Sequence, residues 1–207
     1  WKAAIDATVL KQGVFNFVFH PHGWVQNTQM IEWIDHITET HGNKVKFLNF
    51  REARERLTKN LLGGQSLKAV NGQDNGVRLL DLNNDGFMDA VIGNESVQQT
   101  RLWDPGAKRW KTAPFPFQLV QIDGDGNRID AGARFGVLQP NGNASVLIGN
   151  GKTNGVWHFD GSDWQKDQAL GQGLEIGGQA LRTAIDGRDN GVRLRDIDND
   201  GMCEIIV

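Results

Sequence analysis

The sequence predicts an α+β chain in two parts, an α/β segment followed by repeated antiparallel β-structure. In residues 1–62, apolar residues recur at helical spacing, and short aromatic or β-branched runs separate the helical stretches. From residue 65 onward the helical spacing disappears, and short β-type runs alternate with turns rich in Gly, Asn and Asp. The predicted domains are therefore residues 1–64 and residues 65–207.

Local signals in the first part predict alternating helices and strands. Gly42 is a suitable C-cap for the second helix, and Glu52 can complete a capping box with Asn49 at the start of the third. This order predicts parallel strands with crossover helices. The expected helices are residues 1–11, residues 28–41 and a third from residue 49, and the expected buried strands are residues 14–19 and 44–48. The apolar face of the second helix is expected to hold Met30, Ile31, Ile34 and Ile37.

The second part contains internal repeats. The segment AVNGQDNGVRLLDLNNDG begins at Ala69, and AIDGRDNGVRLRDIDNDG begins 115 residues later at Ala184. A weaker copy from Gly132 lies 56 residues after the equivalent Gly76. A unit of roughly 55–60 residues suits four short strands, the size of a β-propeller blade. The expected repeats are residues 65–122, 123–180 and the beginning of a third at 181–207, too few to close a ring.

Two of these repeats carry an acidic loop with the spacing D-x-[DN]-x-D-G-x-x-[DE]. Calcium is a hard cation that prefers six to eight oxygen ligands, which alternate side chains of a tight loop can supply. Gly86 and Gly201 stand at the sixth position, where the sharp turn is needed. The last loop has four carboxylates and the first has three, so the last is expected to bind Ca²⁺ more tightly. The predicted ligands are Asp81, Asn83, Asp85, the Phe87 carbonyl and Asp89 in the first loop, and Asp196, Asp198, Asp200, the Met202 carbonyl and Glu204 in the last.

Alternatives to a calcium loop are an EF-hand and a solvated Asn/Asp turn without metal. An EF-hand requires a Glu at position 12 and flanking helices, whereas Ile92 and Val207 occupy that position and the flanks alternate like strands. The middle repeat has no carboxylate at the equivalent positions and should not bind calcium. A further acidic stretch at residues 122–130 lies in a different loop and is a weaker candidate.

A separate candidate site follows the first expected strand, in the sequence FNFVFHPHGW. This strand would deliver His20 to its carboxyl end, with His22 and Trp24 close behind. In α/β barrels the chemistry gathers at that end, and a histidine there can act as a general acid or a metal ligand. A histidine at the end of a strand is also often only structural. The other histidines are expected to be surface residues (His36, His41) or structural within a β-strand (His158).

Residues 65–207 resemble the FG-GAP/VCBS repeats of integrin-α-like β-propellers. The similarity is carried by the two acidic loops, Asp81–Asp89 and Asp196–Glu204. The resemblance implies antiparallel propeller blades in an incomplete ring, with structural Ca²⁺ between the strands of a blade. It also implies a carbohydrate or cell-surface ligand.

Residues 1–62 resemble the last part of a polysaccharide deacetylase domain. The similarity lies in the F-x-F-H-P-H run, the helix after it, the KVKFLNF run and a final helix containing REA. The resemblance implies the C-terminal strands and helices of a distorted (β/α) barrel, in a hydrolase that deacetylates carbohydrate with a divalent metal such as Zn²⁺. It implies that His20 is a general acid and that His22 and Trp24 line the sugar subsite.

The family's metal triad, one Asp and two His, comes from earlier motifs that this chain does not contain. We therefore expect an inactive fragment of a larger secreted, carbohydrate-processing enzyme. The alternative is a non-catalytic, calcium-dependent binding or adhesion module.

Composition excludes other classes. The net charge is −3 and the pI about 5.9, so nothing suggests nucleic-acid binding. No apolar run approaches the 18 residues of a membrane helix. The single cysteine, Cys203, cannot form an internal disulfide and is expected to be a small buried strand residue. Low-affinity calcium loops would favour an extracellular or periplasmic location.

Overall fold

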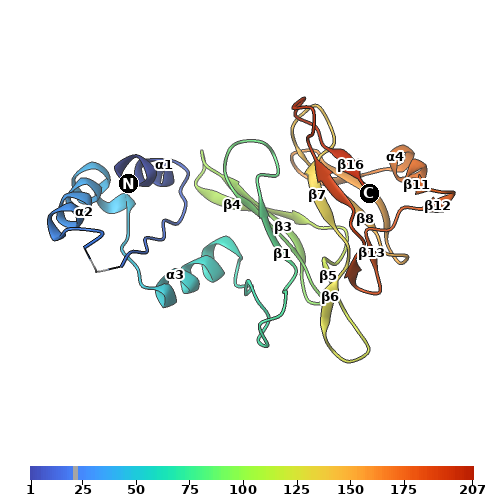
Figure 1. The fold of residues 1–207 in the computed structure, drawn as a ribbon, viewed down its shortest axis with the longest axis horizontal. Coiled ribbons are helices and arrows are strands. Elements are labelled where there is room, and N and C mark those ends of the chain that lie inside the picture. The colour runs from blue at the N-terminus through green and yellow to red at the C-terminus, as the bar shows by residue number, and fades with distance from the viewer. Residues whose placement is uncertain (21–22) are drawn as a thin grey trace. The chain divides into compact units, whose positions relative to one another are not determined.

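The computed structural model describes residues 1–20 and 23–207. The chain is α+β, with few helices and many antiparallel strands in several sheets, and none of the described sheets closes into a barrel (Figure 1). It forms two compact units, residues 1–54 and residues 55–207. The domain boundary between residues 64 and 65, drawn from the change in residue pattern, stays a prediction.

The helices of the first unit form where the sequence predicts them. Gly42 caps the second helix with a positive φ (53°), which glycine adopts without steric cost. The capping box of the third helix is complete: the Asn49 N–H donates to the Glu52 carboxylate (2.9 Å), and the Glu52 N–H donates to the Asn49 side chain (3.0 Å). The helical elements up to residue 61 are α1 (Lys2–Leu10), α2 (Asn27–His41), the 3₁₀ turn η1 (Gly42–Lys44), α3 (Phe50–Arg56), which crosses into the second unit, and the π-helical turn η2 (Leu57–Leu61) of the second unit.

The two strands expected in this part do not form, so the prediction of parallel strands with crossover helices is wrong for the described chain. Of the expected strands 14–19 and 44–48, residues 14–19 and 45–48 have no strand partner, and Lys44 belongs to the 3₁₀ turn η1. An extended segment becomes a strand only when a neighbour accepts its ladder of hydrogen bonds. Phe15 and Phe17 instead pack beside the helices, while Val18 is 76% exposed.

The buried face of α2 also differs from the expectation. The core of the first unit is formed by Ile5 of α1 with Trp33 and Ile37 of α2. Ile31 and Ile34 are exposed. Met30 and Ile37 pack in this core as expected, but Trp33 takes the place expected for Ile34, one residue or about 100° around the helix. Tertiary packing favoured the face that presents the large Trp33 ring.

The second unit contains two four-stranded antiparallel sheets, each built from consecutive strands. The offset between equivalent strands follows the repeat found in the sequence, which confirms four strands per repeat. The predicted hairpins also form, since Trp103 pairs with Trp110 and Phe159 pairs with Trp164. The first sheet is β1 (Val77–Leu80), β2 (Asp89–Gly93), β3 (Gln98–Asp104) and β4 (Arg109–Pro114), and the second is β7 (Arg134–Val137), β8 (Ala144–Gly149), β9 (Asn154–Phe159) and β10 (Trp164–Asp167).

Shorter elements connect and follow the two sheets. The hairpin of β15 and β16 repeats the β1–β2 hairpin of the first sheet, with Arg193 paired to Ile206 as Arg78 is paired to Val91. The remaining elements are β5 (Val120–Ile122), β6 (Arg128–Asp130), α4 (Gln168–Gly173), β11 (Glu175–Ile176), β12 (Gln179–Ala180), β13 (Ala184–Ile185), β14 (Arg188–Asp189), β15 (Arg193–Arg195) and β16 (Glu204–Ile206).

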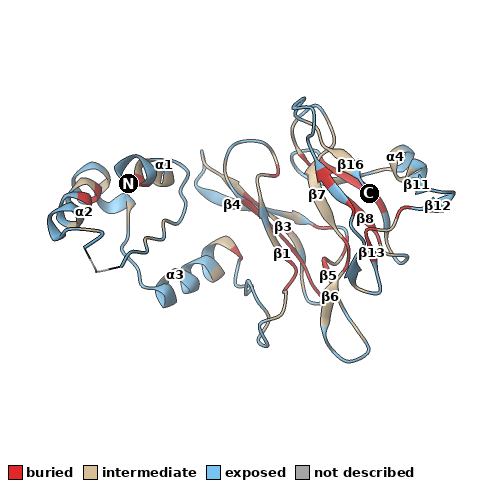
Figure 2. Ribbon diagram, in the orientation of Figure 1, coloured by how far each residue is buried: buried red, intermediate tan, exposed pale blue. Residues whose placement is uncertain are grey.

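The sheets pack face to face through apolar side chains, and their inner strands β2, β8 and β9 are buried along almost their whole length (Figure 2). Val146 and Ile148 of β8 belong to the core shared with the first sheet. Leu147, which points to the other side of β8, packs with Val192 and Leu194 of the third repeat. The second sheet therefore has a core on each face.

Candidate metal sites

The first acidic loop connects β1 to β2 and folds around the side chain of Asp81. Its carboxylate accepts hydrogen bonds from the backbone N–H of Asp85 (3.1 Å) and of Gly86 (2.7 Å). Asn84 (φ 57°) and Gly86 (φ 83°) adopt left-handed conformations, which Gly and Asn tolerate best. The loop is thus the tight turn that the sequence predicts, and both flanks are strands rather than the helices of an EF-hand.

Asn83, at the third position of this loop, has a buried oxygen without a protein partner. Its Nδ2 donates to the Asp85 carboxylate (3.1 Å), but its Oδ1 accepts no hydrogen bond. A buried acceptor left unsatisfied costs about 1–3 kcal/mol. A cation that prefers oxygen ligands would satisfy it, so the loop fits the calcium predicted from its spacing.

Asp89, at the ninth position, is fully buried at the start of β2. Its two carboxylate oxygens accept the N–H groups of Leu82 (3.1 Å) and Trp103 (2.8 Å). Burial raises the pKa of Asp89 to about 6, and the nearby carboxylates of Asp85 and Asp81 add to the rise. The two backbone donors therefore offset only part of the cost of burying this charge.

The last acidic loop, between β15 and β16, brings carboxylates together directly. One oxygen each from Asp196, Asp198 and Glu204 lies within 4.8 Å of the others. The Met202 N–H donates to the Asp200 carboxylate (2.7 Å), as the equivalent residues do in the first loop. The spacing predicted this convergence for three of the four carboxylates of the last loop, whereas Asp200 and the carboxylates of the first loop do not join such a group among the described residues. All of the calcium ligands, the Phe87 and Met202 carbonyls included, stay predictions.

The ninth position has the same structural role in all three repeats. Its side chain accepts the N–H of the second loop residue: Leu82 to Asp89, Leu138 to Ser145 (3.3 Å) and Ile197 to Glu204 (2.8 Å). Because Ser145 does this without charge, closing the loop does not require a carboxylate. The outer repeats therefore carry a negative charge at this position that loop closure alone does not need.

Each loop region also hydrogen-bonds to the next repeat. The Ala144 N–H donates to the Leu82 carbonyl (2.9 Å), and the Cys203 N–H donates to the Val137 carbonyl (2.6 Å). Cys203 is half-buried and precedes β16, so its expected position within a strand is corrected. The loops therefore lie where one stacked repeat contacts the next, which we call the seam between the two repeats.

The acidic stretch at residues 122–130 does not gather its carboxylates among the described residues. Asp123 accepts the N–H groups of Asp125 (3.0 Å) and Asn127 (2.7 Å), which closes the β5–β6 turn. Asp130 instead pairs with Arg134 (2.9 Å). This stretch is a turn and an ion pair.

Of the three residues predicted for catalysis and sugar binding, the structure describes His20 and Trp24. His20 is exposed and its ring contacts Trp24 edge to face, with 5.1 Å between the centroids. Trp24 is 74% exposed. His22 lies outside the described residues. Within the described chain, neither three-ligand group of the kind that could hold a metal ion includes His20.

Two histidines expected at the surface are instead partly buried and paired. The imidazoles of His36 and His41 both approach the carboxylate of Asp6, from α1. Sequence reasoning missed Asp6, because no local spacing relates it to residues 30 and 35 positions later. His158 lies buried in β9, as expected, between Ser145 (2.8 Å) and Asp167 (3.1 Å).

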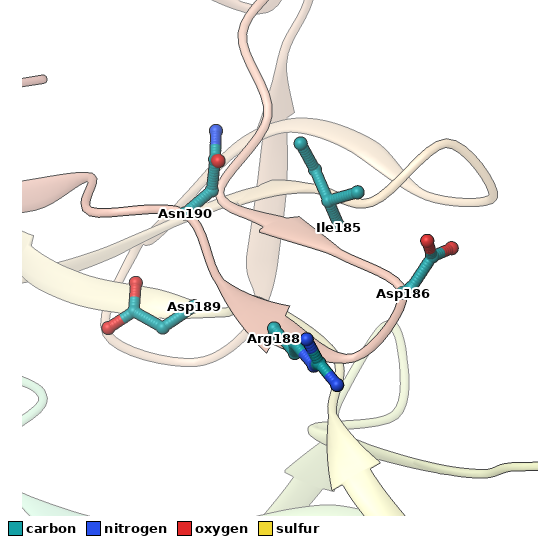
Figure 3. Close-up of a pocket in the computed structure, with 5 residues that line it drawn as sticks. All are labelled: Ile185, Asp186, Arg188, Asp189 and Asn190. Carbon is teal, nitrogen blue, oxygen red and sulfur yellow. The ribbon is translucent and has the colours of Figure 1, made fainter.

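A shallow pocket lies at the β13–β14 hairpin of the third repeat. Its side chains diverge rather than converge on a common point (Figure 3). Asp189 is held by ion pairs with Arg193 and Arg134, so it is not free to bind a ligand. The pocket lacks a converging set of polar groups and is not a candidate site.

No protein-family model, curated protein or solved structure matches this chain. Within the described residues, no helix combines the length and apolar character needed to cross a membrane.

Proposed function

We propose that residues 55–207 are a calcium-stabilised binding module, whose stacked repeats are blades of an incomplete β-propeller. The orphaned Asn83 oxygen in the first loop carries this proposal, because it lies at a predicted ligand position and lacks a protein partner. The converging oxygens of Asp196, Asp198 and Glu204 support a second site. Calcium at these seams would stiffen the contacts between repeats, and the module would present a face to a carbohydrate or cell-surface ligand.

The calcium requirement also supports a location. Extracellular calcium modules bind with dissociation constants of about 10⁻⁴–10⁻³ M, which cytosolic calcium does not reach. We therefore propose an extracellular or periplasmic location.

Thermal unfolding with and without calcium tests the proposal. At 10 mM Ca²⁺, dissociation constants in that range give about 1.4–2.7 kcal/mol of stabilisation per occupied site. The melting temperature should rise with Ca²⁺ and fall back with chelator. A melting curve that neither Ca²⁺ nor chelator changes would contradict the proposal.

Calorimetric titration of loop variants then assigns the sites. Asp81→Asn and Asp196→Asn should each remove one of two binding events, and the last loop should be the tighter. Asp125→Asn is the matched control, since it makes the same change in an acidic turn outside the repeated loops. If the control weakens calcium as much as the loop variants do, binding is nonspecific.

A second proposal is that residues 1–54 belong to a metal-dependent carbohydrate deacetylase, with His20 as general acid. The exposed Trp24 ring beside His20 favours it, because aromatic faces offer apolar surface to sugars. The family resemblance assigns the metal ligands and the base to earlier motifs of such a domain.

Acetate release from acetylated sugars tests this second proposal in the longest native form of the protein. Loss of a general acid lowers the rate by about 10²–10⁴-fold, so His20→Ala should fall in that range. Trp24→Ala should raise KM more than it lowers kcat. Unchanged activity of His20→Ala would remove this residue from the mechanism.

A further inference from the structure

Asp6, His36 and His41 converge in the first unit. The Asp6 Oδ1 lies 2.8 Å from His36 Nε2 and 2.6 Å from His41 Nε2. One ligand atom from each residue lies within 4.8 Å of the other two. The imidazole side chains are 20% and 12% exposed, so they face the interior of the helix pair rather than water.

The apolar core fixes the helices that carry this cluster. Asp6 directly follows Ile5, and His36 directly precedes Ile37. Ile5 and Ile37 are both buried and pack together with Trp33. The backbone positions of two of the three side chains are therefore set by core packing rather than by the cluster itself.

Two imidazoles and a carboxylate are a preferred ligand set for zinc and related divalent transition metals, whereas calcium prefers oxygen alone. Both histidines present Nε2 to the same point. The other nitrogen of His36 lies 3.4 Å from the Thr40 hydroxyl, the kind of outer partner that orients a metal-binding imidazole.

The distances are those of hydrogen bonds and require only a small change to admit a metal. In a tetrahedral zinc site, with bonds of 2.0–2.1 Å, ligand atoms lie roughly 3.3 Å apart. The Asp6 side chain is 43% exposed and has room to withdraw by about half an ångström. Zinc would replace the protons now shared between the carboxylate and the imidazoles.

We propose that Asp6, His36 and His41 form a three-ligand site for a divalent transition metal of the zinc class, which ties α1 to α2 and leaves a fourth position to water. The site is independent of the calcium loops, since it lies in the other unit and uses nitrogen ligands. It also uses none of the residues proposed for deacetylation.

Cobalt and zinc titrations of the 207-residue chain test the site, with 10 mM Ca²⁺ present to fill the acidic loops. One equivalent of Co²⁺ should give the intense visible bands of four-coordinate cobalt, and Zn²⁺ should displace it. His36→Gln and His41→Gln should abolish the bands. Thr40→Val should weaken zinc roughly tenfold, the effect of losing an outer partner.

Two further variants make the result decisive. Glu39→Gln removes a charge from the same helix without removing a ligand, so it should bind zinc like the parent. Asp6→Asn keeps an oxygen that can accept an imidazole N–H, so it should fold by circular dichroism yet bind zinc at least tenfold more weakly. Absent cobalt bands in the parent, or equal zinc affinity in Asp6→Asn and Glu39→Gln, would show that the cluster is only a hydrogen-bonded contact.

Discussion

Three aspartate–arginine pairs occupy the same place in successive repeats. In each pair the arginine follows the aspartate by four residues, and the aspartate also accepts an N–H from the glycine two residues after it. The pairs are Asp74–Arg78 (2.8 Å), Asp130–Arg134 (2.9 Å) and Asp189–Arg193 (2.6 Å). The middle repeat keeps this pair although it has lost the acidic loop, so the pair belongs to the repeat fold and not to calcium.

Asp189 also links two repeats, because Arg134 of the second repeat reaches it at 3.1 Å. The Arg193 guanidinium, the Gly191 N–H and the Arg134 guanidinium hold the pKa of Asp189 well below its usual value of 3.8. A carboxyl whose pKa is lowered by folding stabilises the fold above its unfolded pKa. That contribution is lost as the pH falls below 3.8 toward the folded value.

Asp189→Asn should therefore lower the melting temperature at pH 7, and the gap from the parent should narrow below pH 3.8. Melting curves at pH 7, 5, 3 and 2 measure it. Asp186→Asn is the control, since Asp186 lies in the same hairpin and Asn tolerates its left-handed backbone (φ 49°). A gap of constant size at every pH would contradict the ion-pair explanation.

At the scale of elements, glycines allow one repeat to approach the next. Gly149 ends β8, and its carbonyl accepts the Thr183 N–H at 2.8 Å. A Cβ at this position would lie 2.3 Å from the Leu181 carbonyl oxygen. Gly93 has the equivalent place in the first sheet, where its carbonyl accepts the Leu119 N–H at 2.8 Å.

Gly149→Ala is expected to destabilise the second unit by about 1–3 kcal/mol, the usual cost of overpacking. The cause is a clash with backbone, which cannot rotate away as a flexible side chain can. Urea unfolding measures the change. Gly124→Ala is the control, because no neighbouring atom lies within 4 Å of its Cβ position and its backbone is not left-handed. Equal stability of the two variants would show that the backbone at the seam moves aside for the added methyl group at little cost in free energy.

At the scale of the whole molecule, residues 55–207 are held together by cores shared between repeats. One core lies between the two four-stranded sheets, and Trp164 of the second sheet donates to Thr100 of the first across it (2.8 Å). Another core joins the second sheet to the third repeat. A repeat that buries its apolar faces against neighbours depends on them for stability, so calcium at a seam would act on the whole stack.

Much of this architecture follows from the sequence alone. The helices, the capping box at Asn49, the hairpins at Trp103–Trp110 and Phe159–Trp164, and the tight acidic loops all depend on residues close together in the chain. The offsets of 56 and 115 residues placed equivalent strands correctly, because repeats with the same local pattern form the same hydrogen bonds. Such local interactions form in the same way whatever the rest of the fold is.

Only the tertiary structure decided features that depend on distant partners. Residues 14–19 have strand-forming side chains but no strand to pair with, and α2 buries Trp33 rather than Ile34 because Ile5 packs there. The meeting of Asp6 with His36 and His41 is invisible in the spacing, since the residues lie on two helices. The lack of a hydrogen-bond partner for the Asn83 Oδ1 follows only from the positions of all the neighbouring donors, which the sequence does not give. Contacts between segments far apart in the chain depend on how the elements pack, and a local sequence pattern does not determine that packing.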